Sequence, residues 1–463
     1  MRIHINSRLC AYLLLSILMP LLMTGCSVGF LPWEKGGSPI DPEAAAPAAE
    51  GGQETGKRPS TEPQATEKKT PGPFQSDEEK NIPGQIIPQY PEALVSPAMS
   101  PPGQDVPLPT GAAPPVAVRR ESTARPADFS YRDALLTEDV AWHGEVLIEG
   151  GVTVAPQATL TVQSGTVVRF RGSAGDGKRA VLVVQGRLVV SGTADGPVIF
   201  RSLYESAGTG DWQGLVLLAS GKKNLLENCR VEGAETGLDA TFSTVTMKNV
   251  FFAKCRSGAR LQDCIVLMTG GGAGECGTGV TFYDCEADLR SAEFYGNLLG
   301  ILAVRTSLAV SGCKCTGNNS LALSADKCRL NIAGNSFIGN GSGLGLSGSE
   351  GAVTANRIAQ NAAYGLVLSQ SRVKVGGNDI ERNAKAGLKV EDGRGVAWGN
   401  LIFANGDFDL YNAGTEEFRA IGNWWGEESV NIAGRIYDKR VDEGRGRVLY
   451  LPALRQKPVL ETP

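Results

Sequence analysis

Histidine is almost absent from this sequence: there are two in 463 residues, His4 and His143. His4 lies in an N-terminal segment that we expect to be removed, which leaves His143 alone. With a single histidine, we do not expect most of the general-base, zinc and haem sites that depend on this residue. The net charge of −4 gives no electrostatic basis for binding nucleic acid, so no nucleic-acid partner is expected.

The N-terminal segment has the features of an export signal. A basic start is followed by an apolar run, residues 9–23, which is short for a membrane-spanning helix, and then by Thr24-Gly25-Cys26. Residues 22–26 resemble a bacterial lipobox, although Met23 stands where that family usually has Leu. The resemblance implies a signal peptide at 1–25, acylation of Cys26 with palmitate-type chains, and, because Ser27 follows, the outer membrane. An ordinary signal peptide with an incidental cysteine is the alternative.

Residues 26–128 differ in composition from the rest of the chain. Most of the 25 prolines lie here, among many Ala, Gly, Glu and Thr residues and few aromatic or β-branched ones. Such a segment cannot bury enough apolar surface to offset the entropy of ordering it. We expect a disordered, proline-stiffened tether that carries a folded domain, residues 129–463, away from the membrane.

The expected folded domain contains an internal repeat of about 22 residues. One asparagine column has spacings of 21, 22, 22 and 23: Asn335, Asn356, Asn378, Asn400 and Asn423. Two further columns contain Asn340, Asn361, Asn383 and Asn405, and Gly343, Gly365, Gly387 and Asp409. Apolar residues alternate after each glycine, as they do in a strand with one buried face. The same step places earlier coil starts at positions 229, 250, 271, 292 and 313.

A short period with strand alternation and no helical pattern predicts an all-β parallel β-helix, whose coils stack about 4.8 Å apart. Leucine-rich repeats have a similar length, but their regular leucine frame is absent. Stacking turns each column into a ladder, so inward asparagine amides should hydrogen-bond along the stack. We assign the glycine column to a corner that needs a positive φ.

Residues 135–455 resemble the right-handed parallel β-helix proteins, a group that includes pectate-lyase-like enzymes and NosD-like periplasmic copper-maturation factors. The resemblance rests on the repeat, on TVAPQATLTV at residues 153–162, and on GNWWG at 422–426 with VLYLP at 448–452. It implies a right-handed solenoid whose C-terminal tryptophans cap the open end. It does not imply an activity, because this fold carries lyases, hydrolases, epimerases and binding proteins.

Eight cysteines lie between Cys229 and Cys328. Two pairs are 21 residues apart and should stack on neighbouring coils, namely Cys255 with Cys276 and Cys264 with Cys285. That spacing suits a disulfide, and disulfides persist in exported proteins. We favour buried thiols in inward columns as the interpretation, with disulfides as the alternative. No zinc-type spacing accompanies these cysteines, and no metal site is expected.

One acidic column is the remaining place for catalysis. Asp263, Asp284 and Arg305 follow one another at intervals of 21, so they should lie on three successive coils. The β-helix hydrolases and epimerases use histidine, which His143 alone does not supply, whereas the lyases use calcium and an arginine base. Calcium requires about six to eight oxygen ligands. We therefore favour a solvated turn with a surface ion pair and expect no cofactor, with calcium as the one candidate.

The expected function is a noncatalytic, outer-membrane-anchored binding or structural module for an envelope polysaccharide or protein partner, on the periplasmic side or at the cell surface. Exposed aromatic residues such as Tyr364 and Phe408 are candidate contacts for sugar rings, with local packing at a corner as the alternative. A calcium-dependent polysaccharide lyase is the first alternative function, and a NosD-like role in metal maturation is the second.

Overall fold

The computed structural model describes residue 121 and residues 126–172, 179–205, 208–427, 431–460 and 463. Cys26, the expected signal peptide and nearly all of the expected tether lie outside the described residues. In the part of the chain that is described, no helix has the length and apolar character needed to cross a bilayer.

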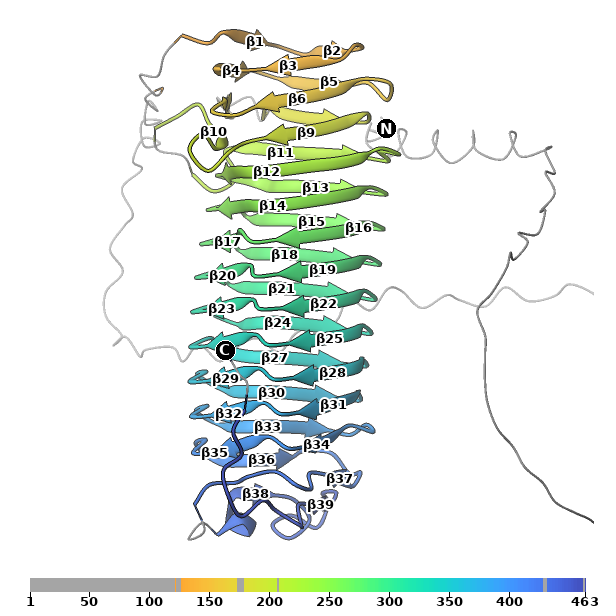
Figure 1. Cartoon of the computed structure of the whole chain (residues 1–463), viewed down its shortest axis with the longest axis vertical. Coiled ribbons are helices and arrows are strands. Elements are labelled where there is room, and N and C mark those ends of the chain that lie inside the picture. Colours follow the sequence, from red (N-terminus) through yellow and green to blue (C-terminus); the bar gives the residue numbers. More distant parts are fainter. Residues whose placement is uncertain (1–120, 122–125, 173–178, 206–207, 428–430, 461–462) are drawn as a thin grey trace, which may run out of the picture. The chain divides into compact units, whose positions relative to one another are not determined.

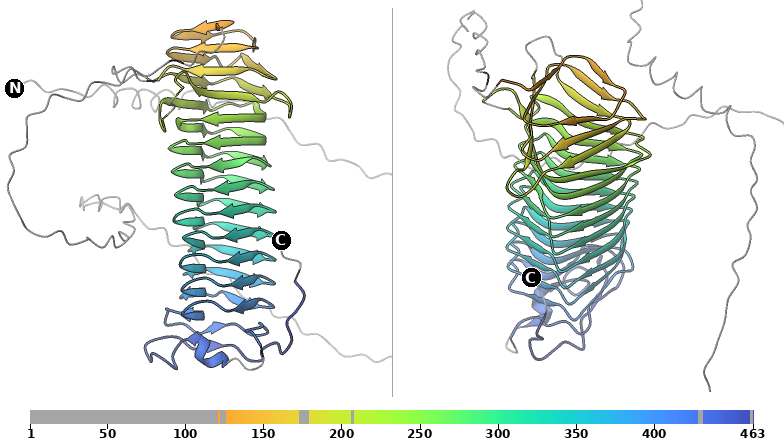
Figure 2. Two further views of the ribbon diagram at one scale, coloured as in Figure 1. Left: turned by 90° about the vertical axis from the view of Figure 1, so that its left-hand side faces the viewer. Right: turned by 45° about the horizontal axis from the view of Figure 1, so that its top comes forward.

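Each coil of the solenoid has three faces, and the strands of each face pair in parallel with those of the neighbouring coils (Figures 1 and 2). The first face is a sheet of 14 strands within the described residues. The second and third faces join into one sheet of 25 strands, because β12 (Lys223–Glu232) and β14 (Thr244–Ala253) continue through the corner between them. The predicted all-β parallel solenoid is therefore confirmed.

The first face consists of β2 (Ala134–Leu136), β5 (Gly151–Val154), β8 (Val181–Val184), β11 (Trp212–Leu218), β13 (Ala234–Thr241), β15 (Ser257–Gln262), β18 (Thr278–Tyr283), β21 (Leu299–Val304), β24 (Leu321–Asp326), β27 (Ser342–Ser347), β30 (Tyr364–Ser369), β33 (Ala386–Glu391), β36 (Phe408–Asn412) and β38 (Ile436–Tyr437). Besides β12 and β14, the second face has β3 (Val140–Trp142), β6 (Thr159–Gln163), β9 (Arg187–Ser191), β16 (Ile265–Thr269), β19 (Glu286–Arg290), β22 (Ser307–Ser311), β25 (Arg329–Ala333), β28 (Glu350–Thr354), β31 (Arg372–Gly376), β34 (Val396–Trp398), β37 (Phe418–Arg419) and β39 (Val448–Leu449). The third face adds β1 (Phe129–Tyr131), β4 (Glu145–Ile148), β7 (Val167–Phe170), β10 (Val198–Ser202), β17 (Gly272–Gly274), β20 (Glu293–Tyr295), β23 (Lys314–Thr316), β26 (Ser336–Ile338), β29 (Arg357–Ala359), β32 (Asp379–Glu381) and β35 (Leu401–Phe403).

The core is built from inward columns of apolar side chains. On the second face one column contains Met247, Met268, Leu289, Val310, Ile332, Val353 and Val375, each paired in register with the next and fully buried. Full burial of such a side chain contributes about 1.5–3 kcal/mol. Because strand side chains alternate, the neighbouring residues of each strand face outward and are free to vary.

Three corners close each coil, and each combines a left-handed residue with an inward polar or small one. At the first corner, between the first and second faces, Asp263, Asp284 and Arg305 have φ of 51°, 53° and 50°. The left-handed conformation costs a non-glycine residue roughly 1–2 kcal/mol. The residue that follows points into the solenoid, and these inward residues form one ladder at each corner.

Two of the ladders are the predicted asparagine columns, at the second and third corners. Asn378 shows the pattern: its side-chain oxygen accepts hydrogen bonds from the backbone N–H of Asn356 at 3.0 Å and from the Asn356 amide at 2.9 Å. Its own amide donates to the Val353 carbonyl at 2.8 Å and to Asn400 at 2.9 Å. The predicted inward amide ladders are confirmed, and the third-corner ladder also includes Asn297 and Asn318, which the sequence columns missed.

Hydroxyls and thiols form the ladder at the first corner. The backbone N–H groups of Cys264, Cys285, Thr306, Cys328 and Ser349 each donate to the side chain one coil later, on Cys285, Thr306, Cys328, Ser349 and Ser371 respectively. Cysteine therefore occupies positions that serine and threonine fill elsewhere. All eight described cysteines are buried, free thiols.

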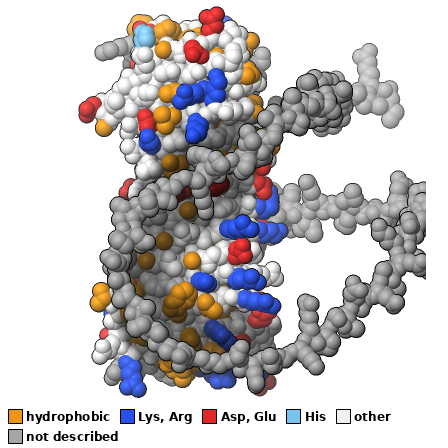
Figure 3. Space-filling view, turned by 45° about the vertical axis from the view of Figure 1, so that its right-hand side comes forward, with side chains coloured by type: hydrophobic (Ala, Val, Ile, Leu, Met, Phe, Trp, Pro, Cys, Tyr) orange, Lys and Arg blue, Asp and Glu red, His pale blue; other side chains and the backbone are white. Residues whose placement is uncertain are grey.

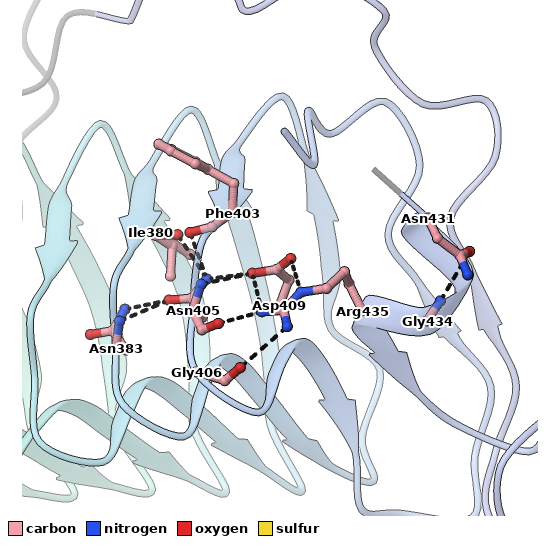
Figure 4. Close-up of polar contacts among 9 residues, drawn as sticks. All are labelled: Ile380, Asn383, Phe403, Asn405, Gly406, Asp409, Asn431, Gly434 and Arg435. Carbon is pink, nitrogen blue, oxygen red and sulfur yellow. Dashed lines mark hydrogen bonds and ion pairs between the residues drawn. The ribbon is translucent and has the colours of Figure 1, made fainter. Parts of the chain in front are cut away.

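The third-corner ladder ends in a buried ion pair (Figure 4). Asp409 stands in the glycine column, and its carboxylate accepts from the Asn405 backbone at 3.1 Å and from the Asn405 amide at 2.9 Å. Arg435, at the end of the 3-10 helix η1 (Ile432–Arg435), donates to the other oxygen of Asp409 at 3.0 Å. The carboxylate thus supplies the acceptor that the asparagine of a following coil would otherwise provide to Asn405.

The C-terminal segment covers the last coil, as the tryptophan motif implied. Trp424 and Trp425 are buried, and Trp424 packs edge-on against Phe403 with ring centroids 4.9 Å apart. After β39 the chain turns back along the stack (Figure 1), where the Leu454 N–H donates to the Asn423 carbonyl at 2.9 Å. The end of the solenoid is therefore not left as an open strand edge.

The glycine column has a different cause from the one that we predicted. Its members have an ordinary φ, and the positive φ values belong largely to the corner residues. A Cβ at Gly258 would lie 2.3 Å from the Gly279 carbonyl oxygen, and one at Gly365 would lie 2.6 Å from that of Gly387. Glycine is required here because backbones of neighbouring coils approach too closely for a side chain.

We predict that Asn378→Ala lowers the free energy of unfolding by about 3 kcal/mol, because it leaves buried donors on Asn356 and the Val353 carbonyl without partners. Urea denaturation measures the change. Asn331→Ala is the matched control, since Asn331 is exposed on β25, and it should change stability by less than about 0.5 kcal/mol. Equal losses in both variants would show that the ladder does not carry this stability.

Candidate functional site

The predicted acidic column is assembled, and an ion pair occupies part of it. The Arg305 guanidinium donates to both oxygens of Asp284, at 2.7 and 2.6 Å. This hydrogen-bonded pairing holds the pKa of Asp284 below its usual value. Asp263 lies one coil earlier, where its carboxylate accepts from the Gln262 amide at 3.3 Å. The column is thus an exposed corner with a bidentate ion pair.

Calcium would need more oxygen ligands than these two aspartates supply. Among the described residues, no group of three or more His, Cys, Asp and Glu side chains is placed to hold a metal ion. His143 packs edge-on against Phe129 with ring centroids 5.0 Å apart, at the first coils. The acidic column and this histidine lie on different coils and do not form a common site.

Ion pairs between neighbouring coils recur over the surface. Lys248 pairs with Glu227 at 2.7 Å, and Lys314 pairs with Glu293 at 3.3 Å, in both cases 21 residues apart. Figure 3 shows Lys and Arg side chains along one edge of the solenoid with acidic side chains between them. Such exposed pairs each contribute about 0–1 kcal/mol. The Asp284–Arg305 pair fits this general pattern.

An aromatic hollow on the first face is a stronger candidate for a site. A cavity of about 340 Å³ opens over β30, β33 and β36, and we call it the aromatic groove; it is lined by Tyr364, Lys385, Ala386, Lys389, Asp407, Phe408 and Tyr411. Its volume is at the lower end of the range typical of ligand sites, about 300–1,000 Å³. Tyr364 and Phe408, which we expected to be exposed and to contact sugar rings, both line it and are half-buried.

Parallel register sets the spacing of the groove. Tyr364 pairs with Ala386, and Ala386 pairs with Phe408, so the two aromatic side chains stand two coils apart in one outward column. Two coils correspond to about 10 Å. Ala386 stands between them in this register and is itself buried.

Aromatic rings close one end of the groove. Phe408 and Tyr411 stack with centroids 6.0 Å apart, and Tyr437 on β38 meets Phe408 edge-on at 5.2 Å. Tyr411 and Tyr437 are tilted against each other at 4.7 Å. Contacts of this kind contribute about 0.5–1.5 kcal/mol beyond the burial of area, so they hold the rings in place.

Two lysines bring positive charge to the groove. The Lys389 ammonium lies 5.1 Å from the centroid of the Tyr364 ring, and that of Lys385 lies 5.6 Å from the same centroid. Lys389 also pairs with Glu391 at the end of β33. Asp407 is the one carboxylate in the described lining, whereas glycoside hydrolysis by acid–base catalysis uses two. The groove therefore presents aromatic ring surfaces and ammonium groups.

Sequence reasoning found Tyr364 and Phe408 but missed Lys385, Lys389, Tyr411 and Tyr437. The 22-residue step contained a signal for two of these, because Lys389 and Tyr411 stand in one outward column that continues to Tyr437.

Two family models match the chain. A right-handed β-helix region matches residues 260–408, and a pectate-lyase-like β-helix domain matches residues 135–244. A search of curated proteins found no significant match.

Several solved structures have a similar fold. The periplasmic alginate epimerase AlgG has 14% identity and a TM-score of 0.35, with 66% of this chain and 77% of that chain covered. The Azotobacter vinelandii mannuronan C-5 epimerase AlgE4 A-module has 14% identity and a TM-score of 0.27, with 58% and 80% covered. The Dettilon tailspike protein gp208 has 10% identity and a TM-score of 0.27, with 68% and 62% covered. At these values the similarity concerns the fold alone.

We predict that the acidic column does not bind calcium, because Arg305 already occupies both oxygens of Asp284. Calcium titration calorimetry with a uronate polymer, followed by absorbance of unsaturated products, should show neither saturable binding nor turnover. In Arg305→Gln the two carboxylates lose their counter-ion, so any weak calcium binding should appear there first. Saturable binding by the unchanged protein that Asp284→Asn abolishes would instead support the lyase alternative.

Proposed function

Since the chain belongs to the right-handed parallel β-helix proteins, we propose that it is a noncatalytic binding module that holds a polysaccharide in the aromatic groove. The observation that carries the proposal is the pair of aromatic side chains, Tyr364 and Phe408, two coils apart with Ala386 between them. The apolar face of a sugar ring can pack on the flat face of an aromatic ring, while the hydroxyl groups at the edge of the sugar stay in water. A spacing of about 10 Å suits two sugar units of an extended chain.

The lysines favour an acidic polysaccharide. Lys385 and Lys389 both lie over Tyr364, so a carboxylate on a sugar stacked there would meet an ammonium group. Such charge-assisted hydrogen bonds are roughly twice as strong as neutral ones. The spacing of the two aromatic residues is fixed by strand register, so little ordering of the protein is needed on binding.

Attachment to the outer membrane through Cys26 is the second part of the proposal. Several acyl chains on one residue give stable anchoring, where a single chain gives only marginal binding. The proline-rich residues 26–128 would then let the solenoid reach polysaccharide or a protein partner away from the bilayer. A periplasmic or cell-surface position is compatible with this arrangement.

We predict that Tyr364→Ala weakens binding of an acidic oligosaccharide by about tenfold or more, which corresponds to about 1.4 kcal/mol. A glycan array on the folded protein would first identify the ligand, and titration calorimetry would then measure affinity. Lys385→Gln combined with Lys389→Gln should weaken binding of acidic but not of neutral oligosaccharides of the same length.

Tyr295→Ala is the matched control for Tyr364→Ala. Tyr295 is 40% exposed and lies on the third face, away from the groove. It should leave affinity unchanged. Equal weakening by both tyrosine variants would remove the groove from the proposal, and an array without signal would point to a protein partner or a scaffold.

For the anchor, we predict that Cys26→Ala abolishes incorporation of a palmitate analogue and releases the protein from membranes into the soluble fraction. Metabolic labelling and detergent phase partitioning measure these two effects. Cys10→Ala is the control, because Cys10 lies within the expected signal peptide and is absent from the mature chain. Unchanged labelling of Cys26→Ala would contradict acylation at this cysteine.

A further inference from the structure

Four of the eight cysteines stand in pairs on the same two coils. Strand register places Ser257 against Thr278 and Ile265 against Glu286, so Cys255 stacks on Cys276 and Cys264 stacks on Cys285. The first pair lies at the third corner and the second pair at the first corner. We propose that both pairs are oxidation sites that become disulfides and join these consecutive coils at two of their three corners.

Contacts between the paired residues support this assignment. The backbone N–H of Cys264 lies 3.4 Å from the sulfur of Cys285, so that sulfur reaches the backbone of its partner. At the other pair, the thiols of Cys255 and Cys276 donate to the carbonyls of Ala253 and Gly274, both at 3.4 Å, so the two sulfurs take the same position on successive coils. Stacked residues on neighbouring parallel strands are about 4.8 Å apart, within the range of about 4.4–6.8 Å between Cα atoms that a disulfide accepts.

The remaining four cysteines have no thiol above or below them. Cys229 lies between Val198 and Val250, and Cys315 lies between Phe294 and Phe337. Cys313 contacts Ala292 and Asn335, and Cys328 contacts Thr306 and Ser349. A disulfide needs two sulfurs within reach of each other, so in the native stack only the paired cysteines can be joined.

The position of the pairs gives the bridges a structural role. The Cys276 N–H donates to the side-chain oxygen of Asn297 at 2.9 Å, so the Cys255–Cys276 pair continues the asparagine ladder beyond its last amide. Bridges at this point would hold together the coils that lack the amide ladder. Each bridge closes a loop of 21 residues in the unfolded chain, which reduces the entropy of that chain.

The chemistry requires a disulfide oxidant, such as oxidised glutathione or an oxidoreductase. One thiolate attacks the oxidant to form a mixed disulfide and releases one reduced thiol. The thiolate of the other cysteine of the pair then attacks the mixed disulfide and displaces the second reduced thiol, so that one protein S–S bond forms and the two S–H protons pass to the two released thiols. Because all four sulfurs are buried in the folded solenoid, we place this reaction before the coils close, during folding.

To test this, the full-length protein is unfolded and refolded in a mixture of oxidised and reduced glutathione. Alkylation and non-reducing peptide mapping should show Cys255 linked to Cys276 and Cys264 linked to Cys285, with the other four cysteines of the solenoid alkylated. The oxidised protein should also have a higher unfolding temperature than the reduced protein.

Matched variants separate bridging from packing. Cys264→Ser should keep the ladder hydrogen bond, because a serine, Ser349, already accepts one in the same ladder. Cys255→Ala introduces the residue type that stands at the same position one coil earlier, Ala234, which is also buried. The double variant should lose the temperature difference between oxidised and reduced protein, whereas Cys328→Ser should keep it. Alkylation of all four stacked cysteines after oxidative refolding, or bridges between other cysteines, would overturn the proposal.

Discussion

The backbone at each corner imposes the constraint on which this solenoid depends. A coil of about 22 residues needs three sharp turns, and each turn buries a backbone N–H that has no partner in its own coil. The acceptor comes from the inward side chain one coil later, as Asn378 provides for Asn356. An unsatisfied buried N–H costs about 1–3 kcal/mol, so the corner residue is restricted wherever a ladder runs.

This constraint also explains the cysteines. A side chain in a ladder must be compact and must accept a hydrogen bond, and asparagine, serine, threonine and cysteine all meet this requirement. Cys285 accepts from the Cys264 backbone just as Ser371 accepts from Ser349. Six of the eight cysteines thus stand at ladder positions, whereas Cys229 and Cys315 lie in apolar columns, and the same stacking brings two pairs of sulfurs together.

The proposed function depends on the outward positions, which the ladders do not restrict. The surface carries many ion pairs between neighbouring coils, and Asp284 with Arg305 is one of them. The aromatic groove differs, because Phe408, Tyr411 and Tyr437 contact one another on two neighbouring coils and the lysines lie over Tyr364. Register fixes the separation of Tyr364 and Phe408 as firmly as it fixes the core, so the fold supplies a preorganised surface.

The sequence by itself determined the period, the strands and the inward amide ladders, because identical stacked positions repeat the same physical requirement along the chain. It also placed Asp263, Asp284 and Arg305 in one column. The predicted reason for the glycine column was wrong. Glycine is needed because Gly365 approaches Gly387 closely, and residue spacing along the chain does not reveal that distance between coils. Only the tertiary structure decided that Arg305 occupies the Asp284 carboxylate, and that Lys389, Tyr411 and Tyr437 join Tyr364 in a groove. These contacts depend on the conformations of outward side chains, which the repeat does not determine.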